Sequence, residues 1–256
     1  MELYEIKDRA SWLTLRKRDV TASEIAGLFG VSKWSSPLQV YADKTGGARE
    51  FGDNAAMKAG RIMESAIAEA VRELHSDWIV EKATKYYRDP ELRIGCTPDY
   101  FKVVGVGMGS VKVPVECKFV QPKIYEADWK DGPPLMYVLQ TLVQIYITGA
   151  PYGYVAVMLD NRAKDVFLYD VPRNDAAWAK IKERVKMFWI DVALGVLPGA
   201  DYTKDGAALK ELYPADAYER PLDLRGDNRL PEILSRRENI KEAVKVMQKT
   251  KEEPVL

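Results

Sequence analysis

The sequence has almost none of the residues that bind transition metals and no excess of charge of either sign. It contains one histidine, His75, and two cysteines, Cys96 and Cys117, so no set of ligands has the spacing of a zinc site. The patterns GxSxG and GxxxxGK and a Cys-His nucleophile sequence are also absent. These absences exclude triad hydrolases, zinc enzymes and P-loop nucleotide hydrolases.

Charge is balanced, with 38 basic and 38 acidic residues and no basic or acidic tail. Such a chain can hold a polyanion only with local patches, so net charge alone argues against nucleic acid as a ligand. Hydrophobic residues make up 47% of the chain and charged residues 30%, the composition of an ordinary globular protein. A length of 256 residues suffices for one large domain or two small ones.

The sequence predicts no membrane span. The longest weakly charged stretch, from Pro133 to Leu159, is interrupted by two glutamines, a glycine and a proline. The first residues, MELYEIKDRAS, lack the apolar run of a secretory signal, and two cysteines alone fit a reducing compartment. We therefore expect a cytoplasmic location and no membrane partner.

Hydrophobic periodicity predicts an α/β chain. Residues 78–120 are rich in β-branched and aromatic residues and contain DPE and GMGS turns, so an antiparallel meander is expected there. A hairpin is expected over residues 152–171. Helices are expected at residues 36–47, 54–75, 134–149, 175–194 and 231–249. We expect one α/β domain with a mixed sheet over residues 1–200, and then a loop-rich segment and a helix over residues 201–256 that packs on the domain or extends it.

Two carboxylates and one lysine are the main candidates for chemistry. In VECKF the strand period of two places Glu116 and Lys118 on one face and Cys117 on the other. Asp99 ends the preceding strand-like run, and pairing of the two strands would bring it close to Glu116. Two carboxylates and a backbone carbonyl form a hard oxygen site that suits Mg²⁺ or Mn²⁺. An isolated D…ExK pattern, however, is more often a surface Glu-Lys pair beside a turn aspartate.

Three other segments carry features that fit the same chemistry. Glu64 lies one helical turn after Gly60, where a missing side chain lets a second backbone come close. Arg16, in an Arg-Lys-Arg cluster, precedes Ser23 and a neighbouring threonine at a predicted helix start, where free N–H donors and basic charge suit phosphate. Gln140 lies on a mostly apolar helix face, where a buried amide needs partners. Each also has a structural alternative: a solvated helix acid, an ordinary N-cap beside an exposed loop, and a solvated glutamine.

The order of these segments, R16…VTAS…GRIME…TPD…ECK…PxxYxxQ, resembles the lambda exonuclease and YqaJ-type viral recombinase family, a branch of the PD-(D/E)xK nucleases. The resemblance extends from about Trp12 to Thr148 by motif and more loosely to about Pro198. It implies a restriction-endonuclease-like fold, with a mixed central sheet flanked by helices and a C-terminal helical extension. The matching motifs imply metal ligands at Asp99, Glu116, Glu64 and the Cys117 carbonyl, catalytic residues Lys118 and Gln140, and a 5′-phosphate site at Arg16, Ser23 and Thr97.

Two features depart from the family pattern. Tyr100 stands where glycine commonly follows the aspartate, and the 16 residues between Asp99 and Glu116 form a longer hairpin than in the best-known member. Neither departure removes a ligand, but both concern the substrate channel beside that hairpin.

The resemblance implies Mg²⁺-dependent 5′→3′ digestion of one strand of linear duplex DNA, with Mn²⁺ as a substitute ion and a 3′ overhang as the product for single-strand-annealing recombination. In this mechanism Lys118 orients or deprotonates the attacking water and Gln140 positions Lys118 or the water. The resemblance also implies a homotrimer, a single-strand annealing protein as partner, and the cytoplasm of a bacterial host if a phage or prophage carries the gene.

Two alternative functions stay open. One is a RecB-like or Cas4-like nuclease with endonuclease activity and without an iron–sulfur cluster, because such a cluster needs four cysteines. The other is a non-catalytic subunit that binds DNA ends, although retention of Asp99, Glu116 and Lys118 argues against it.

Overall fold

A computed structural model describes residues 1–46, 55–105, 107–160, 162–213, 226 and 229–252. Contacts divide the chain into one unit over Met1–Leu212 and a second over Tyr213–Leu256. The sequence placed this division near residue 200. Helix α8 (Gly206–Leu212) belongs to the first unit because Ala208 is fully buried against Leu38 and Ala42 of helix α3 (Pro37–Thr45).

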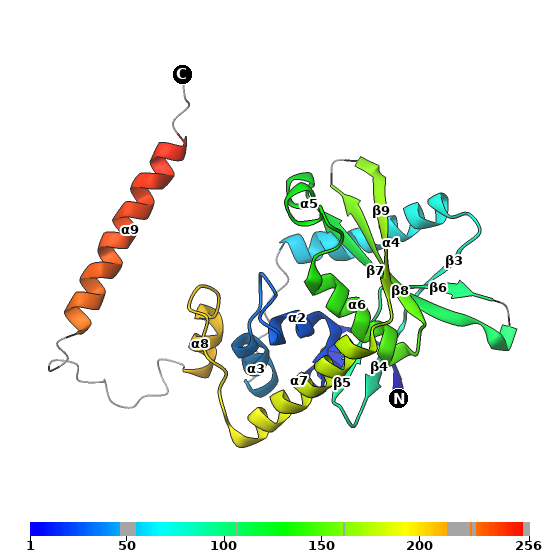
Figure 1. Cartoon of the computed structure of the whole chain (residues 1–256), viewed down its shortest axis with the longest axis horizontal. Coiled ribbons are helices and arrows are strands. Elements are labelled where there is room, and N and C mark those ends of the chain that lie inside the picture. Colours follow the sequence, from blue (N-terminus) through cyan, green and yellow to red (C-terminus); the bar gives the residue numbers. More distant parts are fainter. Residues whose placement is uncertain (47–54, 106, 161, 214–225, 227–228, 253–256) are drawn as a thin grey trace. The chain divides into compact units, whose positions relative to one another are not determined.

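The first unit is built around a mixed five-stranded sheet (Figure 1). Its order is β3 (Ile79–Lys82), β6 (Tyr100–Val104), β7 (Val111–Val120), β8 (Tyr152–Leu159) and β9 (Arg162–Pro172). Strands β7 and β8 are parallel, and the other neighbouring pairs are antiparallel. Because a parallel pair needs a crossover, helices α5 (Pro122–Asp128) and α6 (Leu135–Thr148) lie between β7 and β8 in the chain. The predicted hairpin over residues 152–171 is confirmed.

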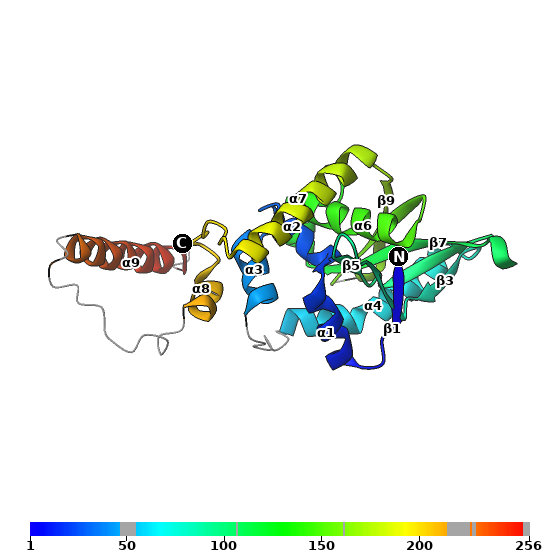
Figure 2. The ribbon, with the colours of Figure 1, turned by 90° about the horizontal axis from the view of Figure 1, so that it is seen from below.

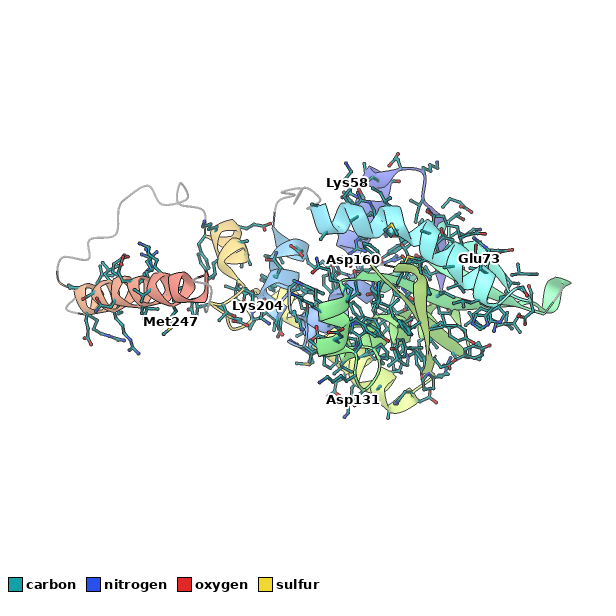
Figure 3. All side chains as sticks on the ribbon, turned by 90° about the horizontal axis from the view of Figure 1, so that it is seen from above. Lys58, Glu73, Asp131, Asp160, Lys204 and Met247 are labelled. Atoms are coloured by element: carbon teal, nitrogen blue, oxygen red, sulfur yellow. The ribbon has the colours of Figure 1, made fainter. Side chains whose placement is uncertain are left out.

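Helices α4 (Ala55–Leu74) and α6 cover opposite faces of this sheet. Alternation along β8 shows the division, since Val155 and Val157 pack in the cluster that contains α6, whereas Ala156 and Met158 pack in the cluster that contains α4. Figure 2 shows α4 and α6 as separate layers, and in Figure 3 the labelled Lys58 and Glu73 mark the two ends of α4. The expected mixed central sheet flanked by helices is therefore present.

A second, four-stranded sheet corrects the expected meander. Its order is β1 (Glu2–Glu5), β4 (Lys85–Asp89), β5 (Ile94–Cys96) and β2 (Val20–Thr21). Strands β3 and β4 are consecutive in the chain but belong to different sheets, as do β5 and β6. The N-terminal strand β1 pairs with β4, so the β4–β5 hairpin belongs to a different sheet from β3. Periodicity predicted the strands but could not choose their partners.

A buried ion pair fixes the end of helix α1 (Arg9–Arg18) against this second sheet. Arg88 of β4 donates from Nε and Nη2 to the two carboxylate oxygens of Asp19, over 2.9 and 2.7 Å, and the Tyr86 hydroxyl donates to the same carboxylate over 3.0 Å. Asp19 is fully buried and directly follows α1. Removal of one partner from such a pair typically costs 3–5 kcal/mol, so the position of α1 is strongly determined.

Two other predicted helices are present with nearly the expected bounds. Helix α7 (Asp175–Leu194) begins at an N-cap, Asn174, and ends at Gly195, whose φ of 68° suits glycine. In the second unit, α9 spans Leu230–Glu252, slightly longer than the predicted helix. Both cysteines are free and buried. No helix among the described residues is long and apolar enough to cross a membrane.

Candidate active site

The site lies where β7 continues past the end of β6. Pairing of the two strands ends with Tyr100 opposite Val115, whereas β7 extends to Val120. The Cys117 N–H has no partner on β6 and donates to Oδ2 of Asp99 over 2.8 Å. The predicted approach of Asp99 to the Glu116 region is therefore confirmed. Asp99 comes close because the Cys117 N–H, which lies beyond the last β6 pair, donates to its carboxylate.

Glu116 lies on the face of the sheet that α6 covers and is only 2% exposed. Its Oε1 accepts hydrogen bonds from Lys118 Nζ and, over 2.6 Å, from Gln140 Nε2. The predicted shared face of Glu116 and Lys118 is confirmed, and Cys117 packs in the cluster on the α4 side. Gln140 is half-buried and has a carboxylate partner, so solvent is not its only contact.

Gln144 is a site residue that the sequence analysis missed. It is fully buried, and its Nε2 donates to Oε2 of Glu116 over 2.6 Å. Its own Oε1 has no hydrogen-bond partner among the described residues. The available signal was its spacing, because residues four apart in α6 lie on one face and Gln140 had already been placed there.

Glu64 comes to the site from α4, on the other side of the sheet. Burial raises the pKa of Glu64, and the negative charge of Glu116 raises it further. Burial likewise raises the pKa of Asp99 well above its ordinary value, with Glu116 again as the second cause. The three predicted acids are thus close enough to repel one another. Gly60 does not behave as expected, since no described segment apart from its own stretch of helix comes within 4 Å of the position of an added Cβ.

Lys118 is the cation among these acids. Burial by itself lowers the pKa of Lys118, but the charges of Glu116 and Asp99 outweigh burial and hold the pKa above its ordinary value. Its ammonium also lies 5.0 Å from the centre of the Tyr137 ring. Lys118 is therefore protonated in this arrangement. This state suits the stabilisation of negative charge and the orientation of water, but it does not suit proton abstraction.

The donor chemistry could hold a hard divalent cation. Asp99, Glu116, Glu64 and the Cys117 carbonyl offer only oxygen ligands. Burial is the main cause of the raised pKa values of Glu64 and Asp99, and the charge of Glu116 adds to both. No group of three acidic, histidine or cysteine side chains in the described part of the chain already surrounds a cation position. Both oxygens of Glu116 instead accept hydrogen bonds from Lys118 and the two glutamines.

A second cluster brings together the three residues predicted to hold phosphate. Arg16 Nη2 donates to Ser23 Oγ over 3.0 Å. The Arg16 guanidinium lies 4.6 Å from the centre of the Trp12 ring, and Trp12 Nε1 donates to Thr97 Oγ1 over 3.1 Å. Trp12 therefore links Arg16 to Thr97, a role that no local pattern in the sequence indicated. Since Thr97 is two residues before Asp99, this cluster adjoins the carboxylates.

The helix start beside this cluster differs from the expectation. A 3-10 turn (Ala22–Glu24) leads into a helix of only four residues, α2 (Ile25–Leu28). The Thr21 N–H donates to Oε2 of Glu24 over 2.7 Å, so it is not free for a phosphate. Lys44, whose side chain is 2% exposed, donates to Glu24 Oε1 and to the Arg16 carbonyl. A phosphate here would therefore be held by side chains.

Comparisons with known proteins agree with this architecture. The five-stranded mixed sheet with α4 and α6 on its faces is a restriction-endonuclease-like fold, as in the alkaline exonuclease of Laribacter hongkongensis. That structure has a TM-score of 0.59 at 23% sequence identity, covering 78% of this chain and 98% of the exonuclease. A phage-related exonuclease from Haemophilus somnus 129PT has a TM-score of 0.50 at 14% identity, covering 71% of this chain and 96% of that one.

Sequence comparison gives the family. Residues 11–151 match the family described as the YqaJ-like viral recombinase domain, and the chain belongs to this family. A relative, the uncharacterized protein YqaJ of Bacillus subtilis (strain 168), is 25% identical over 231 residues, which are 86% of this chain and 68% of the relative. The matched range contains Arg16, Ser23, Glu64 and the whole carboxylate-lysine-glutamine cluster. Family and fold together support a nuclease of the lambda exonuclease kind.

Proposed function

We propose that the protein is a deoxyribonuclease that removes nucleotides from the 5′ end of linear double-stranded DNA and leaves a 3′ overhang. The observation that carries the proposal is the convergence of Asp99, Glu116 and Lys118 at the end of β6, with the Arg16 cluster joined to it through Thr97. Membership of the viral recombinase family and the fold shared with two exonucleases support it. The 3′ overhang is the form of DNA that single-strand-annealing recombination uses.

Each side chain has a stated part in this reaction. Bound Mg²⁺, or Mn²⁺ in its place, would be held by Asp99, Glu116, Glu64 and the Cys117 carbonyl, and would polarise the phosphodiester and activate water. Lys118, held protonated, stabilises the charge that develops on the scissile phosphate and orients the attacking water.

The α6 glutamines position this machinery. Gln140 shares Oε1 of Glu116 with Lys118 and therefore fixes both, while Gln144 fixes the other oxygen. The carboxylate cannot rotate without the loss of at least one of these hydrogen bonds, so its orientation is predetermined.

The Arg16 cluster gives the reaction its direction. A guanidinium and two hydroxyls can bind a terminal 5′-phosphate after each cleavage, and rebinding at the new end favours progressive 5′→3′ digestion. Cleavage is downhill, so no nucleotide hydrolysis is needed. A homotrimer that encloses DNA and a single-strand annealing protein as partner belong to the same proposal through family resemblance.

The test uses linear duplex DNA labelled at either the 5′ or the 3′ end, with Mg²⁺ or with a chelator, beside covalently closed circles. We expect mononucleotide release from the 5′ end, no release with chelator, and intact circles. Cleaved circles would favour the endonuclease alternative. Binding to ends without release of nucleotides in the presence of Mg²⁺ or Mn²⁺ would favour the non-catalytic subunit.

A further inference from the structure

A ladder of aromatic rings extends from the surface to the catalytic lysine. Phe167 of β9 stacks on Tyr125 of α5, with ring centres 5.0 Å apart and planes 19° apart. Tyr125 stacks on Trp129 at 5.8 Å, and Trp129 lies 5.5 Å from Tyr137. The Lys118 ammonium lies over the Tyr137 ring, 5.0 Å from its centre. The ladder thus connects an exposed ring, Phe167, with the proposed active site.

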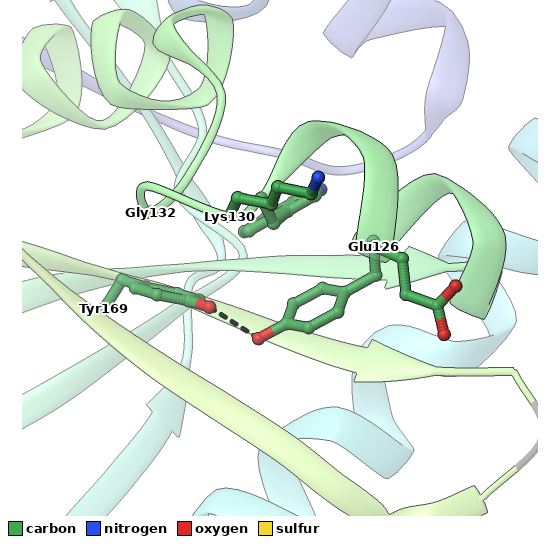
Figure 4. Close-up of a pocket in the computed structure, with 6 residues that line it drawn as sticks. Glu126, Lys130, Gly132 and Tyr169 are labelled. Atoms are coloured by element: carbon green, nitrogen blue, oxygen red, sulfur yellow. Dashed lines mark hydrogen bonds between the residues drawn. The ribbon is translucent and has the colours of Figure 1, made fainter.

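A pocket of about 450 Å³ opens beside this ladder (Figure 4). Its lining comes from α5, from the turn that follows α5, and from β9: Tyr125, Glu126, Trp129, Lys130, Gly132 and Tyr169. The hydroxyls of Tyr125 and Tyr169 lie 2.6 Å apart and form a hydrogen bond. In Figure 4 the Glu126 carboxylate lies on the side away from Tyr169. Lys130, which also lines the pocket, is an exposed cation.

Packing against the core accounts for only part of the area of these rings. None of the residues of α5, all of which the structure describes, is buried. Trp129, directly after the helix, is 3% exposed and belongs to the core, and Tyr125 and Tyr169 pack against that core. Tyr125 and Tyr169 stay half-buried around the pocket, and Phe167 is 40% exposed. Exposed ring area beside a cation offers a stacking surface and a partner for a phosphate, the two features that bind single-stranded nucleic acid.

We propose that this pocket binds an unpaired nucleobase of the DNA strand whose phosphodiester lies at Lys118. The base stacks against the aromatic ladder, and Lys130 pairs with an adjacent phosphate. The pocket volume lies within the range of small-molecule sites, which begins at about 300 Å³, and is large enough for one base and its sugar. The inference rests on the proposed function. It adds that the strand is held open beside the scissile bond, by stacking that is indifferent to sequence because every base has a π-face.

The first experiment measures binding without cleavage. Fluorescein-labelled oligo(dT) is titrated in the presence of chelator, and anisotropy is recorded over a range of salt concentrations. Tyr125→Leu should weaken binding on the order of 5- to 100-fold, because the pocket loses an aromatic wall against which the base packs. Lys130→Ala should reduce the slope of log affinity against log salt by about 0.7, the value for one phosphate on a single strand. Lys180→Ala removes an exposed lysine of α7 and should change neither quantity.

The second experiment places one abasic nucleotide in turn at each of the first few positions of a 5′-phosphorylated duplex. The wild type should slow at one position, and Tyr125→Leu should be slow on the intact duplex with no further loss at that position. Tyr125→Phe keeps the ring and should match the wild type. Equal abasic profiles for wild type and Tyr125→Leu overturn the proposal. If Tyr125→Leu fails to fold, an unchanged salt slope for Lys130→Ala overturns it.

The two proposals fail separately. In one outcome, Tyr125→Leu binds oligo(dT) more weakly than the wild type, but the wild type releases no nucleotide from any duplex. This result would support the base pocket and contradict the nuclease assignment. In the other outcome, the wild type digests duplex DNA at the same rate wherever the abasic nucleotide lies. This result would support the nuclease assignment and contradict the base pocket.

Discussion

Gln144 and Glu116 form a hydrogen bond of 2.6 Å, and both side chains are buried. The bond occupies Oε2 of the carboxylate, while Lys118 and Gln140 occupy Oε1. Helix α6 therefore sets the rotation of a carboxylate that belongs to β7, and the geometry of the acidic cluster depends on the packing of this helix.

Replacement of Gln144 by leucine should lower kcat by about 10- to 100-fold with little change in KM for DNA. The buried carboxylate loses a charge-assisted hydrogen bond, worth about 1.5–3 kcal/mol, and is free to rotate. The measurement is steady-state digestion of duplex DNA, repeated with Glu116→Gln and with the double variant. In the Glu116→Gln background the leucine should have no further effect on rate. A change in unfolding free energy with an unchanged kcat would restrict Gln144 to a structural role.

Lys118→Ala should abolish cleavage and leave DNA binding largely intact. Lys118→Arg should keep a fraction of the activity, because the site holds this residue protonated and the arginine retains the charge but not the shape. Lys112→Ala is a matched control, since Lys112 is another lysine of β7, with an exposed partner in Glu81. Cleavage and binding are measured on the same labelled duplex. Full activity of Lys118→Ala would contradict the site assignment.

Arg16→Ala should reduce the preference for 5′-phosphorylated over 5′-hydroxyl ends by about tenfold, since one charge-assisted contact to phosphate is lost. Trp12→Phe keeps a ring beneath Arg16 but loses the hydrogen bond to Thr97, so its effect should be smaller. Lys17→Ala, at the exposed neighbouring position, should retain the preference. The quantity to compare is kcat/KM for the two kinds of end. An equal loss on both ends would argue against a phosphate pocket.

The raised pKa of Asp43 should make the stability of the protein depend on pH. Burial raises its pKa to about 6, although Gln39 donates to it over 2.8 Å and acts in the opposite direction. The pKa is higher in the folded protein than the unfolded value of about 3.9, so the folded state binds more protons between these values. Asp43 therefore contributes at most ~3 kcal/mol to the free energy of unfolding. This contribution is fully present below about pH 4 and is lost as the pH rises through about 6.

Urea unfolding of the wild type and of Asp43→Asn at several pH values between 4 and 7 measures this contribution. The asparagine variant should lose less stability over this interval, because it keeps the hydrogen-bond acceptor for Gln39 without a titrating group. Identical pH dependence in the two proteins would show that Asp43 has an ordinary pKa.

Several elements could be predicted because they depend on local order in the chain. The period of two in VECKF placed Glu116 and Lys118 together, and helices α6 and α7 followed from their apolar spacing and their ends. The partners of the strands could not be predicted, because the same alternating pattern allows β4 to pair with β3 or, as it does, with β1. The buried contact of Lys44 with Glu24 was also hidden, since charged residues are ordinarily exposed.

The sequence by itself determined the chemistry of this protein: which acids, which lysine and which basic residues are available, and in what order. Only the tertiary structure decided how they meet. Asp99 reaches the Glu116 region because β6 begins at Tyr100, opposite Val115, whereas β7 continues to Val120. Gln144 reaches Glu116 because α6 crosses the same face of the sheet. The aromatic pocket likewise arises from the contact of α5 with β9, more than thirty residues later in the chain. Such contacts depend on how distant segments pack, and no local pattern encodes them.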